Sequence, residues 1–380
     1  MNIALLHDHL ISDGGGERVL KAFAQVWPEA PIFTLLFDPD KTNSFFRDKN
    51  INTSYLQRLP LATSKYQWNL PLRPKAVESF DLSGFDVVLS NSSSLVKGVR
   101  TSPDTLHINY CHTPTRFLWV DKNERLDPAE RFWPISKISN AYKKRLKVWD
   151  LIAADRVDGF IANSRNVQDR IKKYYNRDSV VIYPPVDVGN FLVGNSHSDH
   201  PLNPSLARRK NSYFLIGGRI ASYKRFDMVV RAFNKLGIHL KVFGLGPWLS
   251  VVKKKAGPNI EFIGAVPESE KIKLLAQARA FIHPQVEDFG ITAVESMAVG
   301  TPVIAYQAGG ALETVKDGKT GVFFADQDWQ ALADCVIRFE SAKFDPSAIK
   351  QHTEQFSANR FKREIREYVD EKWNDFKDRN

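Results

Sequence analysis

Short apolar runs alternate with longer segments of helical spacing along the whole chain. In the first half the apolar runs occupy residues 3–7, 87–90, 107–111 and 159–163, and in the second half 213–216, 240–243, 260–263, 280–283 and 303–306. Runs of this length, separated by helix-length segments and often ending at glycine, predict parallel strands connected by helices. The pattern therefore predicts an α/β protein with two series of parallel strands, whose ligands bind beyond the carboxyl ends of the strands.

A stiff, proline-containing segment separates the two series of strands. Tyr183-Pro184-Pro185 restricts the backbone, and the polar stretch 194–211 follows it. We therefore expect one domain over residues 1–185 and a second over residues 186–358. A chain of 380 residues is long enough to bury two ordinary hydrophobic cores.

The most informative motif is a pair of glutamates, Glu287 and Glu295, on either side of a glycine that begins an apolar helix. Gly290 lets the backbone approach a ligand closely, and the amides of Phe289, Gly290 and Ile291 begin a helix whose positive end suits a phosphate. Because Glu295 lies about two turns into this helix, the two carboxylates are placed to hold different hydroxyls of one extended ligand. The alternative is an unrelated pair of acids, one before a helix and one within it.

A second motif places two cations at a junction between a strand and a helix. An apolar strand runs into Gly217-Gly218, which is followed by Arg219 and, five residues later, by Lys224 before a helical run over 226–233. Arginine offers a planar fork and lysine a mobile charge, and the helix N-terminus adds its own positive field. This arrangement suits a diphosphate held without a metal ion, and a solvated basic turn is the alternative.

These motifs, together with Gly309-Gly310, resemble the retaining GT-B glycosyltransferases of family GT4, and the resemblance extends over nearly the whole chain. Residues 13–18 resemble the family's first glycine-containing loop, and residues 110–119 resemble the segment that carries its active-site histidine. The second of these segments, with 160–164 and 182–187, is particularly similar to bacterial mannosyltransferases of O-antigen and exopolysaccharide assembly.

The resemblance implies a fold and a set of site residues. It implies two Rossmann-like domains that face each other across a cleft, an acceptor-binding domain over 1–185 and a donor-binding domain over 186–358, with a C-terminal helix within 359–380 crossing back to the first. The implied catalytic residues are His112, Arg219, Lys224 and Glu287. The implied donor-binding residues are Gly15, Gly16, Gly218, Val266, Phe289, Gly290, Ile291 and Glu295.

The family also implies roles for several of these residues. Glu295 would bind the ribose of the nucleotide, Arg219 and Lys224 would stabilise the departing diphosphate, and His112, as a neutral imidazole, would donate to a sugar hydroxyl or to the diphosphate. The expected reaction moves a hexose, mannose from GDP-mannose, to a hydroxyl of a glycan or a polyprenyl-linked sugar. The alternatives are a family member that uses a UDP-sugar and a protein that binds nucleotide sugars without catalysis.

Nucleic acid and anionic membranes are both candidate partners for a chain with a formal net charge of +10. We expect no nucleic-acid partner, because the sequence has no zinc-finger spacing, no RNP-like strand and no basic region followed by heptads. Basic residues concentrate at 143–147 and 170–173, and the first group suits a helix with one apolar and one basic face on an anionic surface. Its apolar residues are Tyr142, Leu146, Val148, Trp149 and Ile152. The alternative is that this apolar stripe packs on the domain core.

Several kinds of site are not expected. Cys111 and Cys335 are the only cysteines, so the sequence supports neither a disulfide framework nor a cysteine-rich zinc site. The Asp-x-Asp patterns at 38–40 and 326–328 are interpreted as turns, and we expect no metal and no cofactor. No apolar run approaches the ~18 residues of a membrane-spanning helix, and Met1-Asn2-Ile3 enters a strand without a basic leader. We expect a cytoplasmic enzyme, with peripheral attachment to the inner face of the membrane as a further hypothesis.

Overall fold

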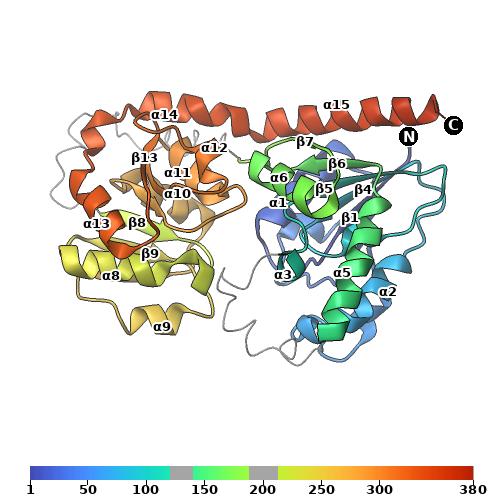
Figure 1. Ribbon diagram of the computed structural model, residues 1–380, viewed down its shortest axis with the longest axis horizontal. Helices are drawn as coiled ribbons and strands as arrows, with labels where there is room; N and C mark the ends of the chain where they lie inside the picture. The colour runs from blue at the N-terminus through green and yellow to red at the C-terminus, as the bar shows by residue number, and fades with distance from the viewer. Residues whose placement is uncertain (120–139, 188–212, 380) are drawn as a thin grey trace. The chain divides into compact units, whose positions relative to one another are not determined.

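The computed structural model describes residues 1–119, 140–187 and 213–379, and these form two compact units (Figure 1). The first unit contains the described residues up to Pro185 together with those from Ala358 onward, and the second contains those from Val186 to Ser357. Each unit has its own parallel sheet and its own hydrophobic core. Among the described residues, no helix combines the length and the apolar character needed to cross a membrane.

The first unit is built on a seven-stranded parallel sheet in the order β3-β2-β1-β4-β5-β6-β7. Its strands are β1 Ile3–His7, β2 Ile32–Thr34, β3 Ile51–Thr53, β4 Val87–Ser92, β5 Leu106–Cys111, β6 Gly159–Ala162 and β7 Ser179–Val181. All residues of β1, β4 and β5 are buried, as expected of central strands covered on both faces. The strand order changes direction between β1 and β4, so the loops that follow these two strands separate and leave a place for a ligand.

Helices cover both faces of this sheet. They are α1 Gly15–Val26, α2 Arg73–Glu78, α3 Arg116–Trp119, α5 Asn140–Asp155, α6 Arg165–Tyr175 and α15 Ala358–Lys377, with 3-10 turns η1 Ser44–Phe46, η2 Tyr55–Arg58, η3 Tyr66–Leu72 and η4 Val96–Gly98. The C-terminal helix α15 belongs to this unit, as predicted, because its buried face packs on α1 and β5. Phe361 stacks on Phe23 at 5.8 Å between ring centroids, and Arg366 donates to the carbonyl of Val26 at 2.7 Å.

The second unit has a six-stranded parallel sheet in the order β10-β9-β8-β11-β12-β13. The strands are β8 Phe214–Gly217, β9 Leu240–Phe243, β10 Ile260–Gly264, β11 Phe281–His283, β12 Val303–Tyr306 and β13 Gly321–Phe324. This is the Rossmann order, and its change of direction falls between β8 and β11. The two strongest sequence motifs directly follow β8 and β11. The fold therefore brings both motifs together at the carboxyl ends of these central strands.

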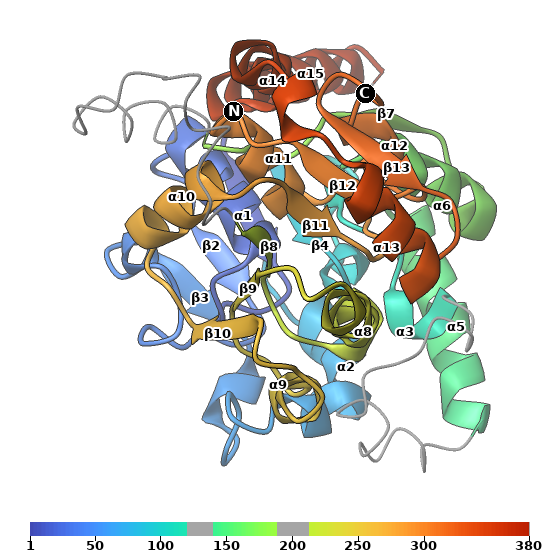
Figure 2. The same cartoon turned by 90° about the vertical axis from the view of Figure 1, so that its left-hand side faces the viewer.

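Helices also cover both faces of the second sheet (Figure 2). On one face α8 packs against α9 and α13, and on the other α10, α12 and α14 gather around α11. The helices are α8 Phe226–Leu236, α9 Leu249–Lys253, α10 Glu268–Gln277, α11 Ile291–Ala298, α12 Ala311–Thr314, α13 Trp329–Arg338 and α14 Pro346–Thr353, with turns η7 Ser222–Lys224, η8 Ser341–Lys343 and η9 Glu354–Phe356. The predicted two-sheet α/β architecture is therefore confirmed.

Candidate functional site

The two motifs of the second unit meet at the change of strand direction. Lys224, the last residue of η7, forms an ion pair with Glu287, which follows β11. The side chains are 18% and 17% exposed, so the pair is largely shielded from solvent and still partly accessible. Two charges predicted from separate motifs about sixty residues apart are thus neighbours in the fold.

Gly290 is required at the start of α11 for two reasons. Its φ of 93° lies in the left-handed region, which disfavours residues with a side chain, and a Cβ at this position would come within 3.2 Å of the His283 ring. Phe289 beside it is buried against Phe356, with the ring centroids 5.4 Å apart. The first amides of α11, beginning at Ile291, therefore follow a backbone turn that only glycine accommodates, and such amides are the natural donors to a phosphate.

The Gly309-Gly310 pair, which contributes to the family resemblance, supports the Glu287 segment. The amide of Gly310 donates to the carbonyl of Glu287 at 2.8 Å. A Cβ on Gly309 would lie 2.5 Å from that carbonyl oxygen, and a Cβ on Gly310 would lie 2.5 Å from the Cα of Phe289. These glycines are therefore needed for close backbone packing that fixes the position of Glu287.

Gly218 and Arg219 lie on the other side of the site, directly after β8. Gly218 has a φ of 116°, and its carbonyl oxygen would be 1.9 Å from a Cβ on Gly244, so both glycines are needed where these loops touch. Arg219 is exposed and forms no hydrogen bond or ion pair with the described residues. The structure thus pairs Lys224 with a carboxylate and leaves the Arg219 guanidinium available to a ligand.

Glu295 is 1% exposed and has a strong partner that sequence reasoning missed. Lys271 of α10 contacts the Glu295 Oε1 atom at 2.9 Å and Glu268 at the same distance. Lys271 belongs to no recognisable sequence motif. Its contact with Glu295 arises only because α10 packs on α11. Val266, one of the implied donor-binding residues, is half-buried in the loop between β10 and α10.

His283 is a second residue of this site that sequence reasoning missed. Its side chain is buried, and the Nε2 atom has no hydrogen-bond partner among the described residues. Burial lowers its pKa to about 4, although Glu287 acts in the opposite direction. The ring is therefore neutral near physiological pH. It lies at the carboxyl end of the apolar strand β11, which is the only signal that the sequence offered.

The predicted histidine of the first unit lies in a hydrogen-bonded cluster that also contains Gly16. Asn91 Oδ1 lies 2.5 Å from His112 Nε2, and Asn91 Nδ2 lies 3.0 Å from His7 Nδ1 and 2.8 Å from the Gly16 carbonyl oxygen. A Cβ on Gly16 would come within 3.2 Å of the His7 ring and 3.6 Å of His112 Nε2. Gly15 is the first residue of α1, next to this cluster. The structure therefore brings the predicted residues Gly16 and His112 together.

His112 is neutral in these surroundings. Burial lowers its pKa to about 3, and the nearby His7 lowers it further against the opposite effect of Asp8. The ring nevertheless keeps part of its surface exposed. Asn91 lies in the polar sequence Ser90-Asn91-Ser92 at the carboxyl end of β4, a position that could have marked it as a site residue.

Asp8 fixes the loop that follows β4. Its carboxylate accepts hydrogen bonds from the amides of four consecutive residues, 93–96, at 2.7 to 2.9 Å. Burial raises the pKa of Asp8, but His9 and these amides outweigh burial and hold the pKa below its ordinary value. The ionised carboxylate therefore holds the loops after β1 and β4 together, next to the cluster of Asn91 and His112.

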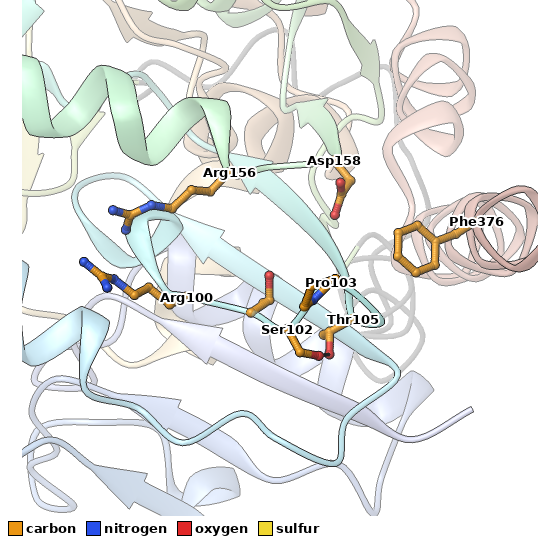
Figure 3. A pocket seen from close by; sticks show the side chains of 8 residues that line it. Arg100, Ser102, Pro103, Thr105, Arg156, Asp158 and Phe376 are labelled. Carbon is orange, nitrogen blue, oxygen red and sulfur yellow. Dashed lines mark hydrogen bonds between the residues drawn. The ribbon is translucent and has the colours of Figure 1, made fainter. Parts of the chain in front are cut away.

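A cavity of about 460 Å³ in the first unit lies away from these residues (Figure 3). Arg100, Thr105, Arg156 and Asp158 line it, on segments that precede β5 and β6, and Phe376 of α15 closes one side. The cavity is therefore at the amino ends of the strands, whereas His112 is at the carboxyl ends. We do not assign it to the site.

The Asp-x-Asp segments have structural partners. Asp328 caps α13 by accepting from the amide of Ala331 at 2.8 Å, and Asp38 accepts from Lys41 at 2.7 Å. Within residues 1–119, 140–187 and 213–379, no three histidine, cysteine or acidic side chains gather as metal ligands do.

Comparison with known proteins shows that two family models match this chain. The model described as Glycosyltransferase Family 4 matches residues 13–190, and the model described as Glycosyl transferases group 1 matches residues 202–362. The GDP-mannose-dependent alpha-(1-6)-phosphatidylinositol monomannoside mannosyltransferase of Mycolicibacterium smegmatis is 32% identical over 136 residues, which are 31% of this chain and 36% of the relative. The alpha-1,3/1,6-mannosyltransferase of Dictyostelium discoideum is 25% identical over 373 residues, or 84% of this chain and 85% of the relative.

Solved structures share the fold. HepE of Anabaena in complex with UDP superposes with a TM-score of 0.68 at 17% identity, over 98% of this chain and 100% of HepE. The chain spans about half the length or less of several curated relatives that it matches. For three of them, the matched part is 49%, 36% and 27% of the relative's length. Since one family model matches each half of the chain and the structural neighbours share its two-unit fold, the protein belongs to the family 4, group 1 glycosyltransferases of GT-B fold.

Proposed function

We propose that this protein is a retaining glycosyltransferase that moves a hexose from a nucleoside diphosphate to an acceptor hydroxyl. The observation that carries the proposal is the Lys224–Glu287 ion pair beside the glycine-initiated N-terminus of α11. A cation, a carboxylate and a set of helix amides at one edge of a sheet match the charge and hydroxyl pattern of a sugar diphosphate. Family membership supports the same reaction.

The chain's residues have distinct roles in this reaction. Arg219 and Lys224 stabilise the negative charge that develops on the leaving diphosphate, while Glu287 and the amides at Phe289–Ile291 hold the sugar and the phosphate. Glu295 binds the ribose through its carboxylate, which Lys271 holds in place. The bond between the anomeric carbon and the phosphate oxygen breaks, and the acceptor oxygen attacks from the same face. The acceptor proton passes to the departing phosphate, so no second carboxylate is required as a base.

We propose GDP-mannose as the donor. The sequence segments 110–119, 160–164 and 182–187 support it through their similarity to bacterial mannosyltransferases, and two of the relatives are named as mannosyltransferases. A UDP-sugar is the competing donor. HepE was solved with UDP, but at 17% identity that structure bears on the fold alone.

We also propose that the acceptor is lipid-linked and that the enzyme works at the anionic cytoplasmic face of a membrane. The predicted amphipathic helix is α5, and its residues divide between two sides. Leu146 is buried, and Trp149 is half-buried with its Nε1 atom donating to Glu78 at 2.8 Å. Asp150 also faces inward, where it accepts from Lys97 at 2.5 Å. The exposed side carries apolar and basic residues together: Val148, Leu151, Ile152, Lys144, Arg145 and Lys147.

A neighbouring segment, the η2–η3 segment over residues 55–75, adds to this surface. Its exposed apolar side chains include Trp68 at 61% and Leu61 at 59% exposure, with Tyr55 and Leu72 also exposed. It contains three exposed basic residues, Arg58, Lys65 and Lys75, and no acidic residue. It packs in the same hydrophobic cluster as Leu146 of α5, and Tyr142 donates to the Leu70 carbonyl at 3.3 Å. Exposed aromatic and aliphatic side chains among cations fit an anionic lipid surface.

A donor panel tests the proposed reaction. Purified protein is incubated with GDP-mannose, UDP-glucose and UDP-galactose, and both turnover and the shift in unfolding temperature are measured. We expect stabilisation and turnover with GDP-mannose. Turnover with a UDP-sugar alone would replace the donor and keep the reaction class. The relatives' acceptors are supplied in the same assay. If donors stabilise the protein but none is hydrolysed or transferred, the protein only binds nucleotide sugars, and the proposal is contradicted.

A further inference from the structure

Asn91, at the carboxyl end of β4, contacts His7 and two predicted site residues of the first unit, Gly16 and His112. Its amide nitrogen lies 2.8 Å from the Gly16 carbonyl oxygen and 3.0 Å from His7 Nδ1, and its amide oxygen lies 2.5 Å from His112 Nε2. Asn91 is fully buried, so each of these contacts replaces a hydrogen bond to water.

The Gly16 carbonyl fixes the orientation of the Asn91 amide. A carbonyl oxygen can only accept a hydrogen bond, so the atom of Asn91 that faces it must be the NH₂ group. The second N–H of that group points to His7 Nδ1, which must therefore carry no proton. The remaining atom, Asn91 Oδ1, can only accept, and it faces His112 Nε2. His112 must therefore carry a proton on Nε2.

The same surroundings keep His112 neutral. The titratable groups that act on it are His7 and Asp8 of the first strand and its following loop, and burial of the ring outweighs the attraction of Asp8. A neutral imidazole has a single N–H group, and Asn91 occupies it. Nδ1 is left with a lone pair and makes no hydrogen bond with the described residues.

We propose that Asn91 is a positioning residue that holds His112 as the Nε2–H tautomer, so that His112 accepts a hydrogen bond from a sugar hydroxyl through Nδ1. This inference rests on the proposed glycosyl transfer and deepens it. The oxygens of a nucleoside diphosphate carry no proton near neutral pH, and a bare Nδ1 has none to offer them. In this proposal His112 recognises a hydroxyl as an acceptor and takes no part in binding the diphosphate, unlike the donor role that the family resemblance implies.

The tautomer is directly measurable. In protein labelled with ¹⁵N in its histidines, long-range ¹H–¹⁵N correlation distinguishes the Nε2–H, Nδ1–H and doubly protonated rings, and the signals that disappear in His112→Gln identify His112. We expect the Nε2–H form throughout about pH 5 to 9, well above the titration of the ring. An Nδ1–H tautomer, or a doubly protonated ring at neutral pH, would overturn the proposal. This measurement needs no substrate, so it remains readable even if the proposed transfer is wrong.

Variants then test the role of Asn91. Asn91→Ala removes the acceptor from Nε2, so we expect a mixture of His112 tautomers and a loss of kcat/KM of about tenfold, the equivalent of one hydrogen bond. Ser90→Ala is the matched control, because it removes the buried hydrogen bonds of Ser90 to His107, Ile108 and Asn109 and none that His112 makes. A single Nε2–H tautomer in folded Asn91→Ala, or an equal tautomer mixture in Ser90→Ala, would show that Asn91 does not set the state of His112.

Discussion

Two cations of the second unit differ in their surroundings, and this difference decides what their substitution does. Arg219 is exposed without a described partner, whereas Lys224 is paired with Glu287. We expect Arg219→Glu to reduce kcat/KM by roughly a thousandfold without a change in unfolding temperature, because it places a negative charge where the diphosphate leaves. Lys319→Glu, a charge reversal of an exposed lysine in the same unit, is the control. Turnover of Arg219→Glu within about tenfold of wild type would remove Arg219 from the site.

A glycine substitution tests how the Glu287 segment is held. Gly310 has an ordinary helical φ of −61°, so Gly310→Ala introduces no backbone strain of its own. Its Cβ would lie 2.5 Å from the Cα of Phe289 and 2.6 Å from the carbonyl oxygen of Asp288. We expect the displaced segment to lower both activity and stability, the latter by about 1–3 kcal/mol. Wild-type activity in Gly310→Ala, measured beside its denaturation midpoint, would mean that the segment's position is not critical.

Sequence reasoning found the charged residues of the site and missed several of their partners. Glu287, Lys224 and His112 stand in short motifs, and their residue types alone suggest chemistry. Lys271 and Asn91 stand in no motif, because their partners are 24 and 21 residues away along the chain. Such partners become visible only when the order of strands and helices is known.

At the scale of elements, the central strands were predictable and most edge strands were not. Strands β2, β3 and β7 have three residues each and lie toward the edges of the first sheet, and β13 lies at the edge of the second. An edge strand is covered by fewer neighbours, so it needs no continuous apolar run. Accordingly, no residue of β3 (Ile51–Thr53) or β7 (Ser179–Val181) is fully buried.

The exposed surface made by α5 and the η2–η3 segment has a direct test in vesicle co-sedimentation. We expect binding that increases with anionic lipid and decreases with salt, because each cation near such a surface contributes on the order of 1 kcal/mol. Replacing Lys144, Arg145 and Lys147 by glutamine should weaken binding. Trp68→Ser together with Leu61→Ser should weaken it further, since these side chains lose apolar contact with lipid.

The control for this surface is Ile337→Ser, which removes an equally exposed apolar side chain from the second unit. It should leave vesicle binding unchanged. Equal sedimentation with neutral and anionic vesicles, or none at low salt, would contradict attachment through this surface.

At the scale of the whole molecule, the lowered pKa values of several histidines make stability depend on pH. Burial lowers the pKa of His9 and His112 to about 3 and of His107 and His283 to about 4, below the ordinary value of 6.5. Below pH 6.5 the unfolded chain therefore binds more protons than the folded chain, so the free energy of unfolding falls as the pH falls. Each such histidine contributes a loss on the order of 1 kcal/mol per pH unit until its folded pKa is reached.

Chemical denaturation at a series of pH values checks this expectation. The denaturation midpoint should be highest above pH 6.5 and decrease steadily toward pH 5, with both units affected because His283 lies in the second. His107→Gln, which removes one titrating ring that is not itself a site residue, should flatten the slope. A midpoint that does not change between pH 7 and pH 5 would show that these rings are not held neutral in the folded protein.

The central claim is a retaining transfer in which cations of the protein take the place of a metal ion. The most direct measurement is the NMR determination of the anomeric configuration of the product formed from GDP-mannose in excess chelator. The account predicts an α-linked product, the configuration of the donor, at a rate equal to that without chelator. A β-linked product, or activity that disappears with chelator and returns with magnesium or manganese, would contradict it.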